Sequence, residues 1–177
     1  MKARQRGAAL LVLMVLLVTA VAAFGMAGLR RGTSEARRNQ DQQSLALGIA
    51  ALRSAAFVRR CANRTTPLAD LLPCADASTT EGTSAASCPG LTQGWLPWRT
   101  LGLPPLRDSS GTCLWYERNG TTARVIVAGA AIGAQNRSAS SGRTICGGNL
   151  TATNYLDAGD QSLAMTLDTA AMVARCP

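Results

Sequence analysis

The sequence predicts an α+β protein in which one long N-terminal helix, transmembrane in its first half and amphipathic in its second, packs on a small antiparallel-sheet head with disulfides. Three observations predict this fold: an apolar run of membrane length, a helical stripe in the polar residues after it, and a β-hairpin signal among six cysteines. We expect four parts, which are a basic leader at 1–7, a transmembrane helix half at 8–29, a polar, amphipathic helix half at 30–64 and a globular head at 65–177.

The apolar run extends from Ala8 to Leu29 without a charged residue. At about 1.5 Å per helical residue it spans roughly 33 Å, enough for a hydrocarbon core of about 30 Å. As a secretory signal peptide it would be cut after Ala20-Val21-Ala22, but the apolar region of a signal peptide usually covers about 7–15 residues. Because this run continues to Leu29, we expect it to remain as an anchor, with the short basic tail before it in the cytoplasm.

The helix is predicted to continue over residues 33–60. Apolar residues recur there at i, i+4, i+7 and i+11, the spacing of one face of a helix with about 3.6 residues per turn. This stripe must cover an apolar surface, most simply the head or a neighbouring helix. The residues from Asn63 to Pro67 are expected to end the helix. The members of the stripe are Leu45, Ile49, Leu52 and Ala56.

The net charge of +8 belongs to the predicted helix and not to the head. Residues 1–29 carry +3, residues 30–64 carry +6 and residues 65–177 carry −1. A basic stretch beside a membrane segment is usually neutralised by anionic headgroups or neighbouring acids. Nucleic-acid binding is the alternative, but Phe57 is the single aromatic residue of the basic stretch, so stacking platforms are missing. We therefore expect membrane lipid, and not nucleic acid, as the partner.

All six cysteines follow the apolar run, which predicts disulfides in an oxidising compartment. Their spacings are wide, and the chain has no C-x-x-C and no histidine, so we expect no metal site. Six cysteines allow 15 pairings, and the sequence does not choose among them. A bond between Cys74 and Cys88 would close a loop without regular pattern, and Cys61 would tie the helix end to the head. The candidates are Cys61, Cys74, Cys88, Cys113, Cys146 and Cys176.

The strongest local signal in the head is a β-hairpin. Two β-rich runs, Cys113–Arg118 and Thr122–Ala128, flank Asn119-Gly120, the pair that favours a type I′ turn. Val125 and Val127 would share one side, with Trp115 or Tyr116 opposite. Further along, alternating Leu163, Met165 and Leu167 predict another strand, and Asp168 would cap a short helix over 169–174.

Two other stretches of the head carry weaker signals. Residues 79–84 are rich in turn formers and are predicted to form an exposed loop. The stretch from Gly94 to Pro105 holds three prolines and two tryptophans, which predicts a stiff, extended segment whose rings pack on the core. The alternative is that Trp95 and Trp98 form a contact for a partner or ligand.

The sequence offers no catalytic constellation. Without histidine, neither a Ser-His-Asp nor a Cys-His arrangement is possible. Neither a phosphate-binding P-loop motif nor a dinucleotide-binding glycine motif is present. We therefore predict a protein that is not an enzyme and binds no cofactor.

From the leader to about Arg60 the chain resembles the type IV pilin and type II secretion pseudopilin class. In that class a basic leader ends in glycine, a prepilin peptidase cuts after it, and the new amino terminus is methylated. The resemblance implies a cut between Gly7 and Ala8 and methylation of Ala8. It also implies that the long helix enters a filament core beside other pilin or pseudopilin subunits, while a disulfide-bearing sheet domain lies outside.

One position departs from the usual pattern of the class. Most pilins carry glutamate at the fifth mature position, and this chain has Val12 there. In this respect it is similar to the tip pseudopilin of type II secretion. Several segments of the head also resemble pseudopilin-like proteins of bacteria with pilus or secretion systems. They are Gly94–Trp98, Thr100–Leu103, Trp115-Tyr116, Val125–Gly129, Gly133–Arg137 and Tyr155-Leu156.

The resemblance implies a minor pilin or pseudopilin, at or near the tip of a type IV pilus or type II secretion pseudopilus. Its expected location is the bacterial inner membrane, as a single-pass protein with a periplasmic head, and a surface filament after assembly. The alternative is a single-pass, membrane-anchored periplasmic protein that binds a partner through Trp95–Trp98 and does not enter a filament.

Overall fold

The chain forms two compact units, Met1–Asn39 and Gln40–Pro177. The computed structural model describes residues 3–67, 70–76, 80–88, 91–129, 143–146, 161–166 and 176. Within the helix, the side chains of residues 3–11, 13 and 20–31 lie outside this description.

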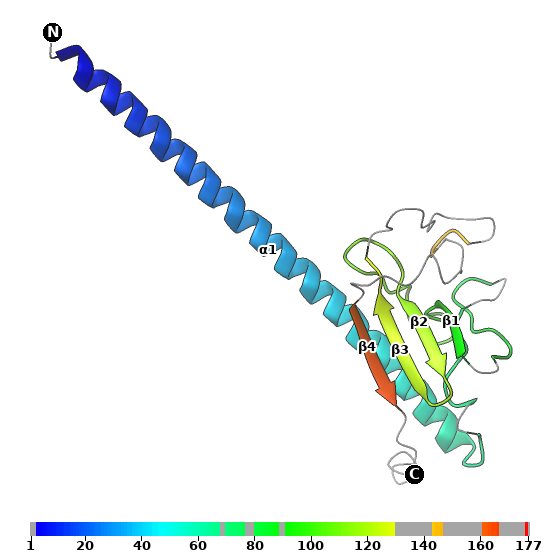
Figure 1. Ribbon diagram of the computed structural model, residues 1–177. Coiled ribbons are helices and arrows are strands. Elements are labelled where there is room, and N and C mark those ends of the chain that lie inside the picture. The colour runs from blue at the N-terminus through cyan, green and yellow to red at the C-terminus, as the bar shows by residue number, and fades with distance from the viewer. Residues whose placement is uncertain are drawn as a thin grey trace. The chain divides into compact units, whose positions relative to one another are not determined.

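One helix, α1, extends from Ala3 to Ala62 (Figure 1). The sequence allows its length because no proline occurs before Pro67. The helix ends where predicted. Asn63 donates its N–H to the Arg59 carbonyl, and its side-chain oxygen accepts the N–H of Thr65, both at 3.0 Å. Arg59 and Arg60 in the last turn also complement the negative end of the helix dipole.

The predicted transmembrane half, residues 8–29, is helical along its backbone. Among the residues that the structure describes, no helix is long and apolar enough to cross a membrane. Most side chains of the 8–29 segment lie outside those residues.

The second unit contains a four-stranded antiparallel sheet in the order β1-β2-β3-β4 (Figure 1). Each described strand therefore pairs with its neighbour in the sequence. The Leu163–Met165 alternation correctly predicted β4, although Leu167 lies outside the described residues, as do Asp168 and the helix predicted over 169–174. The strands are β1 (Leu91–Trp95), β2 (Trp115–Asn119), β3 (Thr122–Val127) and β4 (Gln161–Thr166).

The predicted hairpin is confirmed as β2–β3, but the predicted turn is wrong. Asn119 pairs with Thr122, so the turn residues are Gly120 and Thr121. Type I′ requires positive φ at both turn residues, whereas here only Gly120, with φ of 56°, has positive φ. Glycine at the first turn position with a negative φ after it is the pattern of a type II′ turn, which also fits the strand twist.

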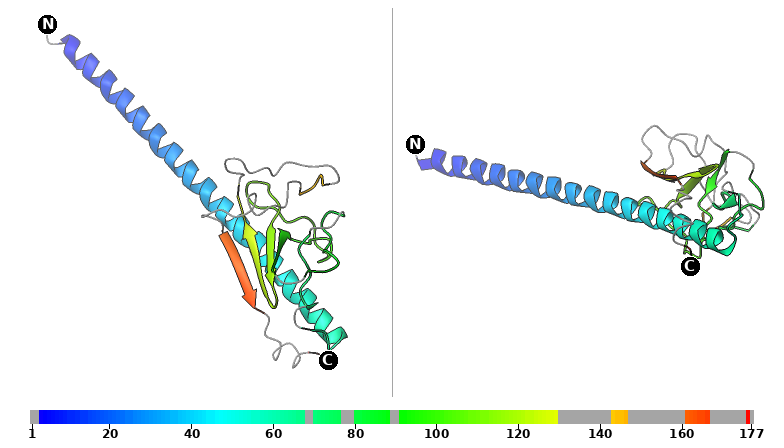
Figure 2. Two further views of the ribbon diagram at one scale, coloured as in Figure 1. Left: turned by 45° about the vertical axis from the view of Figure 1, so that its right-hand side comes forward. Right: turned by 90° about the horizontal axis from the view of Figure 1, so that it is seen from below.

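The part of α1 after Gln40 packs on one face of this sheet (Figure 2). All four residues of the predicted stripe are buried there, against Tyr116 and Val125 among others. Gly48 lies on the same face, and a Cβ added to it would be 3.3 Å from Val125 Cγ1. Glycine therefore lets the helix backbone approach β3 closely, which gives a physical reason for a poor helix former in this helix.

The opposite face of the sheet carries a second core cluster. Trp95, Trp115 and Ile126 form its centre, and the loops around the Cys113–Cys146 disulfide cover it. The prediction of an exposed loop at 79–84, of which Thr79 lies outside the described residues, is wrong for Glu81 and Gly82, which are buried. Both are held by polar contacts to distant segments, which a local turn signal does not reveal.

Helix packing generates a stability prediction. Leu52 is fully buried, while Leu47 on the same helix is 55% exposed. We expect Leu52→Ala to lower the free energy of unfolding by about 2–5 kcal/mol, because a cavity is left between α1 and the sheet. Leu47→Ala loses the same atoms from an exposed site and should change stability by about 0.5 kcal/mol or less. Urea unfolding of the full chain in nonionic detergent, followed by tryptophan fluorescence, compares the two; equal losses would contradict this packing.

Candidate functional site

The first unit presents a surface of large apolar side chains on α1. Six described residues between positions 12 and 18 are each 58–64% exposed. Because successive helical residues are about 100° apart, these positions surround the helix and do not form one stripe. A helix that is apolar on all sides is typical of a lipid or helix-bundle environment. The residues are Val12, Met14, Val15, Leu16, Leu17 and Val18.

The polar side chain next to this surface is satisfied within the helix itself. The Thr19 hydroxyl donates to the carbonyls of Val15, at 3.0 Å, and Leu16, at 2.9 Å. Such back-bonding removes the need for a water partner. The surface can therefore enter an apolar environment without leaving that hydroxyl unpaired.

The predicted processing site at Gly7 and Ala8 lies in the helical backbone of α1, and its side chains are outside the described residues. Val12, the fifth position after the predicted cut, is 60% exposed. The chain therefore presents an apolar side chain at this predicted position.

All six cysteines form disulfides, in the pairs Cys61–Cys176, Cys74–Cys88 and Cys113–Cys146. The structure thus closes the irregular loop with Cys74–Cys88 and ties the helix end to the head through Cys61, as the sequence allowed. The partners of Cys113 and Cys146 were left open by the sequence. Three disulfides indicate an oxidising, extracytoplasmic location.

The predicted partner contact at Trp95 and Trp98 is wrong for this structure, because both rings are buried, at 0% and 8% exposure. Trp95 packs on Trp115 with ring centroids 3.9 Å apart. Trp98 lies against Gly82, where an added Cβ would clash with its ring. The other interpretation, that these rings pack on the core, is confirmed. A protein that bound a partner through these tryptophans would need an exposed ring, and neither ring is exposed.

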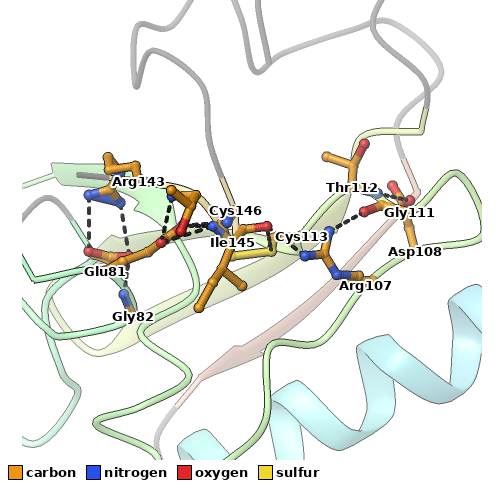
Figure 3. The surroundings of a disulfide bond; sticks show 12 residues. Glu81, Gly82, Arg107, Asp108, Gly111, Thr112, Cys113, Arg143, Ile145 and Cys146 are labelled. Carbon is orange, nitrogen blue, oxygen red and sulfur yellow. Dashed lines mark hydrogen bonds and ion pairs between the residues drawn. A yellow bond between two sulfur atoms is a disulfide. The ribbon is translucent and has the colours of Figure 1, made fainter. Parts of the chain in front are cut away.

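Buried carboxylates fix the loops of the head (Figure 3). Glu81 accepts the backbone N–H groups of Thr144 and Ile145, at 3.0 Å, and that of Cys146. Asp76, fully buried, pairs with Arg143 at 2.9 Å and accepts the Gly82 N–H at 2.7 Å. These contacts clamp residues 143–146 onto Asp76 and Glu81 beside the Cys113–Cys146 disulfide.

A second pair of acids joins α1 to the loop before β2. Asp41 on the helix accepts the N–H of Ser109 at 2.7 Å. The neighbouring Asp108 is buried and accepts the N–H groups of Ser110 and Thr112, at 2.9 Å, and of Gly129, at 3.1 Å. The loop therefore has a fixed shape, set by Asp108, which accepts three backbone donors, and by Asp41, which accepts the N–H and the hydroxyl of Ser109.

Sequence reasoning missed these acids, for different reasons. Asp108 begins Asp-Ser-Ser-Gly, a turn sequence in which the side chain is expected to bond the backbone that follows. That signal was available. Glu81 and Asp76 had no comparable signal, because their partners at 143–146 lie more than sixty residues along the chain.

Comparison with known proteins gives no family model, curated protein or solved structure that matches this chain. Within the described part of the chain, no group of three or more Cys, Asp or Glu side chains is placed to hold a metal ion. The candidate functional surface is the apolar surface of α1 at positions 12–18, on a helix whose later part packs on a disulfide-bonded head.

The Glu81 clamp generates a prediction about local opening. In Glu81→Gln one acceptor oxygen becomes an NH₂ group, which faces backbone donors. We expect the free energy of opening at residues 144–146 to fall by about 1–3 kcal/mol, because buried N–H groups lose their partner. Amide hydrogen exchange measures this loss. Glu117→Gln is the control, since the Glu117–Arg124 ion pair is partly exposed and worth about 1 kcal/mol or less. Unchanged exchange at 144–146 would contradict the clamp.

Tyr116 generates a prediction about alkaline pH. Its hydroxyl donates to the Pro73 carbonyl at 3.0 Å, and burial raises the pKa of the phenol far above its usual value, although Arg118 and Arg59 lower it. The phenol ionises in the unfolded chain near pH 10, so stability is unaffected below that pH and falls as the pH rises above it. Tyr116→Phe should cost about 1 kcal/mol at pH 7 and flatten the alkaline fall. Urea unfolding at pH 7 to 11 checks both effects; an equally steep fall in the variant would contradict the assignment.

Proposed function

We propose that this chain is a minor pilin or pseudopilin, a structural and non-enzymatic subunit at or near the tip of a type IV pilus or type II secretion pseudopilus. The observation that carries the proposal is the apolar surface of α1 at positions 12–18, exposed on all sides of the helix. An antiparallel head with three disulfides agrees with the class, because that class places such a domain outside the membrane.

The energetics favour a helix that exchanges one apolar environment for another. Removing a large apolar side chain from water is worth about 1.5–3 kcal/mol, so six such residues strongly disfavour exposure to water. Lipid tails satisfy this requirement before assembly. Neighbouring subunit helices satisfy it afterwards, since acyl chains and packed leucines are similarly apolar. The mechanism is therefore assembly: the helix leaves the inner membrane and enters a filament core.

Val12 supports a tip position over a repeated shaft position. In the pilin class the glutamate at this position is thought to neutralise the amino terminus of an adjacent subunit within the membrane. An unpaired charge in that environment is costly. A subunit with valine at this position offers no carboxylate to the amino terminus of an adjacent subunit. It therefore fits the tip of the filament, where one of the two neighbouring subunits is absent.

The proposal includes a location and partners. The chain is a single-pass protein of the bacterial inner membrane whose head lies in the periplasm, in agreement with an oxidising compartment for its disulfides. Its partners are membrane lipid, a prepilin peptidase and other pilin or pseudopilin subunits. Lys2, Arg4 and Arg6 leave with the leader after the peptidase cuts.

Mass spectrometry of the protein isolated from its native membrane tests the processing step. We expect a chain that begins at N-methylated Ala8. In Gly7→Leu a bulky side chain before the cut hinders approach of a membrane protease, so the leader should be retained. Gly32→Leu is the control, because a Cβ there meets nothing within 4 Å, and it should be processed normally. An intact Met1 in the unchanged chain, or a terminus near Ala23, would contradict the proposal.

In-cell cross-linking tests the assembly step. A photoreactive residue in place of Val15 should capture other pilin or pseudopilin subunits, because that position lies on the apolar surface. The same residue in place of Val58, an exposed position of α1 within the second unit, is the control for random collision. Capture of lipid alone under conditions that assemble the filament would favour an anchored protein outside the filament.

A further inference from the structure

A cleft of about 840 Å³ opens in the second unit. The last turn of α1, the 70–74 segment, the 84–88 segment and the β2–β3 turn line it. Two arginines also line it, Arg59 from the last turn of α1 and Arg118 from β2. The proposed filament function uses neither arginine.

Arg118 is a buried cation without an anionic partner in the described part of the chain. Its residue is 4% exposed. Its guanidinium donates to Cys88 Sγ at 2.6 Å, to Cys74 Sγ at 3.6 Å and to the Gly120 carbonyl at 3.5 Å. Sulfur is a weak acceptor and the carbonyl bond is long. A buried guanidinium is costly unless an opposite charge pairs with it, so this group is incompletely satisfied.

Arg59 adds a second guanidinium to the same cleft. It donates to the carbonyls of Asp70 and Leu71 at 3.3 and 3.4 Å, both long bonds to neutral oxygens. Both arginines therefore line the same cavity. Two planar donor groups around one cavity match the geometry of a carboxylate.

The remaining lining favours a peptide over a small inorganic anion. Leu72, Pro73 and Ala85 give the cleft apolar walls, and Ser87 and Asn119 add polar groups. Asp70 also lines the cleft but is exposed, so the two arginines leave the lining with an excess positive charge. Its volume lies in the range of about 300–1,000 Å³ that is typical of ligand sites and is far larger than one phosphate ion needs.

We propose that this cleft binds an acidic peptide segment of a partner protein, with a glutamate or aspartate carboxylate of that segment between Arg118 and Arg59. The apolar walls hold the aliphatic part of the segment. This site is independent of the filament proposal, because it uses the second unit alone.

The test uses the full chain, ¹⁵N-labelled, in nonionic detergent, so that no charged headgroup competes. A terminally blocked Gly-Glu-Glu-Gly peptide is titrated, with Gly-Gln-Gln-Gly and inorganic phosphate as parallel probes. We expect saturable shifts of the Asn119 and Gly120 amides with the glutamate peptide and about tenfold weaker binding of the other two probes. Equal binding of the two peptides would overturn the role of the carboxylate. Phosphate binding as tight as that of the glutamate peptide would overturn the choice of a peptide.

Matched variants locate the site. Arg118→Gln and Arg59→Gln should each weaken binding of the glutamate peptide by about tenfold, because each removes a charge-assisted donor. Arg53→Gln removes the same charge from an exposed position of α1 outside the cleft and should stay within about twofold of the unchanged chain. If Arg118→Gln does not fold, Arg59→Gln alone decides, since Arg59 is only partly buried. Unchanged affinity of Arg59→Gln would overturn the proposal.

Discussion

Close approach of α1 to β3 is the constraint on which the second unit depends. Gly48 brings the helix backbone to the Val125 side chain, and Leu52 and Ala56 are fully buried on the same face. Small residues at such a contact allow backbones to come near, while leucine fills the space beside them. The sheet therefore has one face covered by a helix, and its other face must be covered by loops.

Those loops cover the tryptophan rings of the second core cluster, and carboxylates hold the loops in place. Residues 81–82 and 143–146 shield Trp95 and Trp98 from water. Hydrogen bonds to Glu81 and Asp76 hold these two segments in place. A buried carboxylate that accepts several backbone N–H groups satisfies itself and its loop together. Ion pairs and hydrogen bonds here organise irregular backbone in the way that strand pairing organises the sheet.

The sequence predicted the features that depend on short-range periodicity. The helical stripe, the β2–β3 hairpin and the alternation of β4 all repeat within a few residues, so each is readable locally. The turn register was missed by one residue, because Asn119 and Gly120 both suit a turn and only strand pairing decides between registers. Only the last two residues of strand β1, Gly94 and Trp95, fell in the stretch predicted as extended chain, because the glycine and the nearby prolines obscure the strand pattern. No signal in the sequence indicated the environment of Arg118, because its guanidinium contacts a disulfide whose two cysteines lie 30 and 44 residues upstream.

Cys61 and Cys176 lie 115 residues apart along the chain. Their disulfide therefore closes the backbone between them into a covalent ring. Tension carried along α1 enters this ring at the end of the helix, where it divides between the backbone and the disulfide. Unravelling of the sheet can therefore lengthen the chain only as far as the ring permits. A single proteolytic cut anywhere inside the ring would likewise leave both fragments attached until the bond is reduced, so the integrity of the chain depends on redox state as well as on packing.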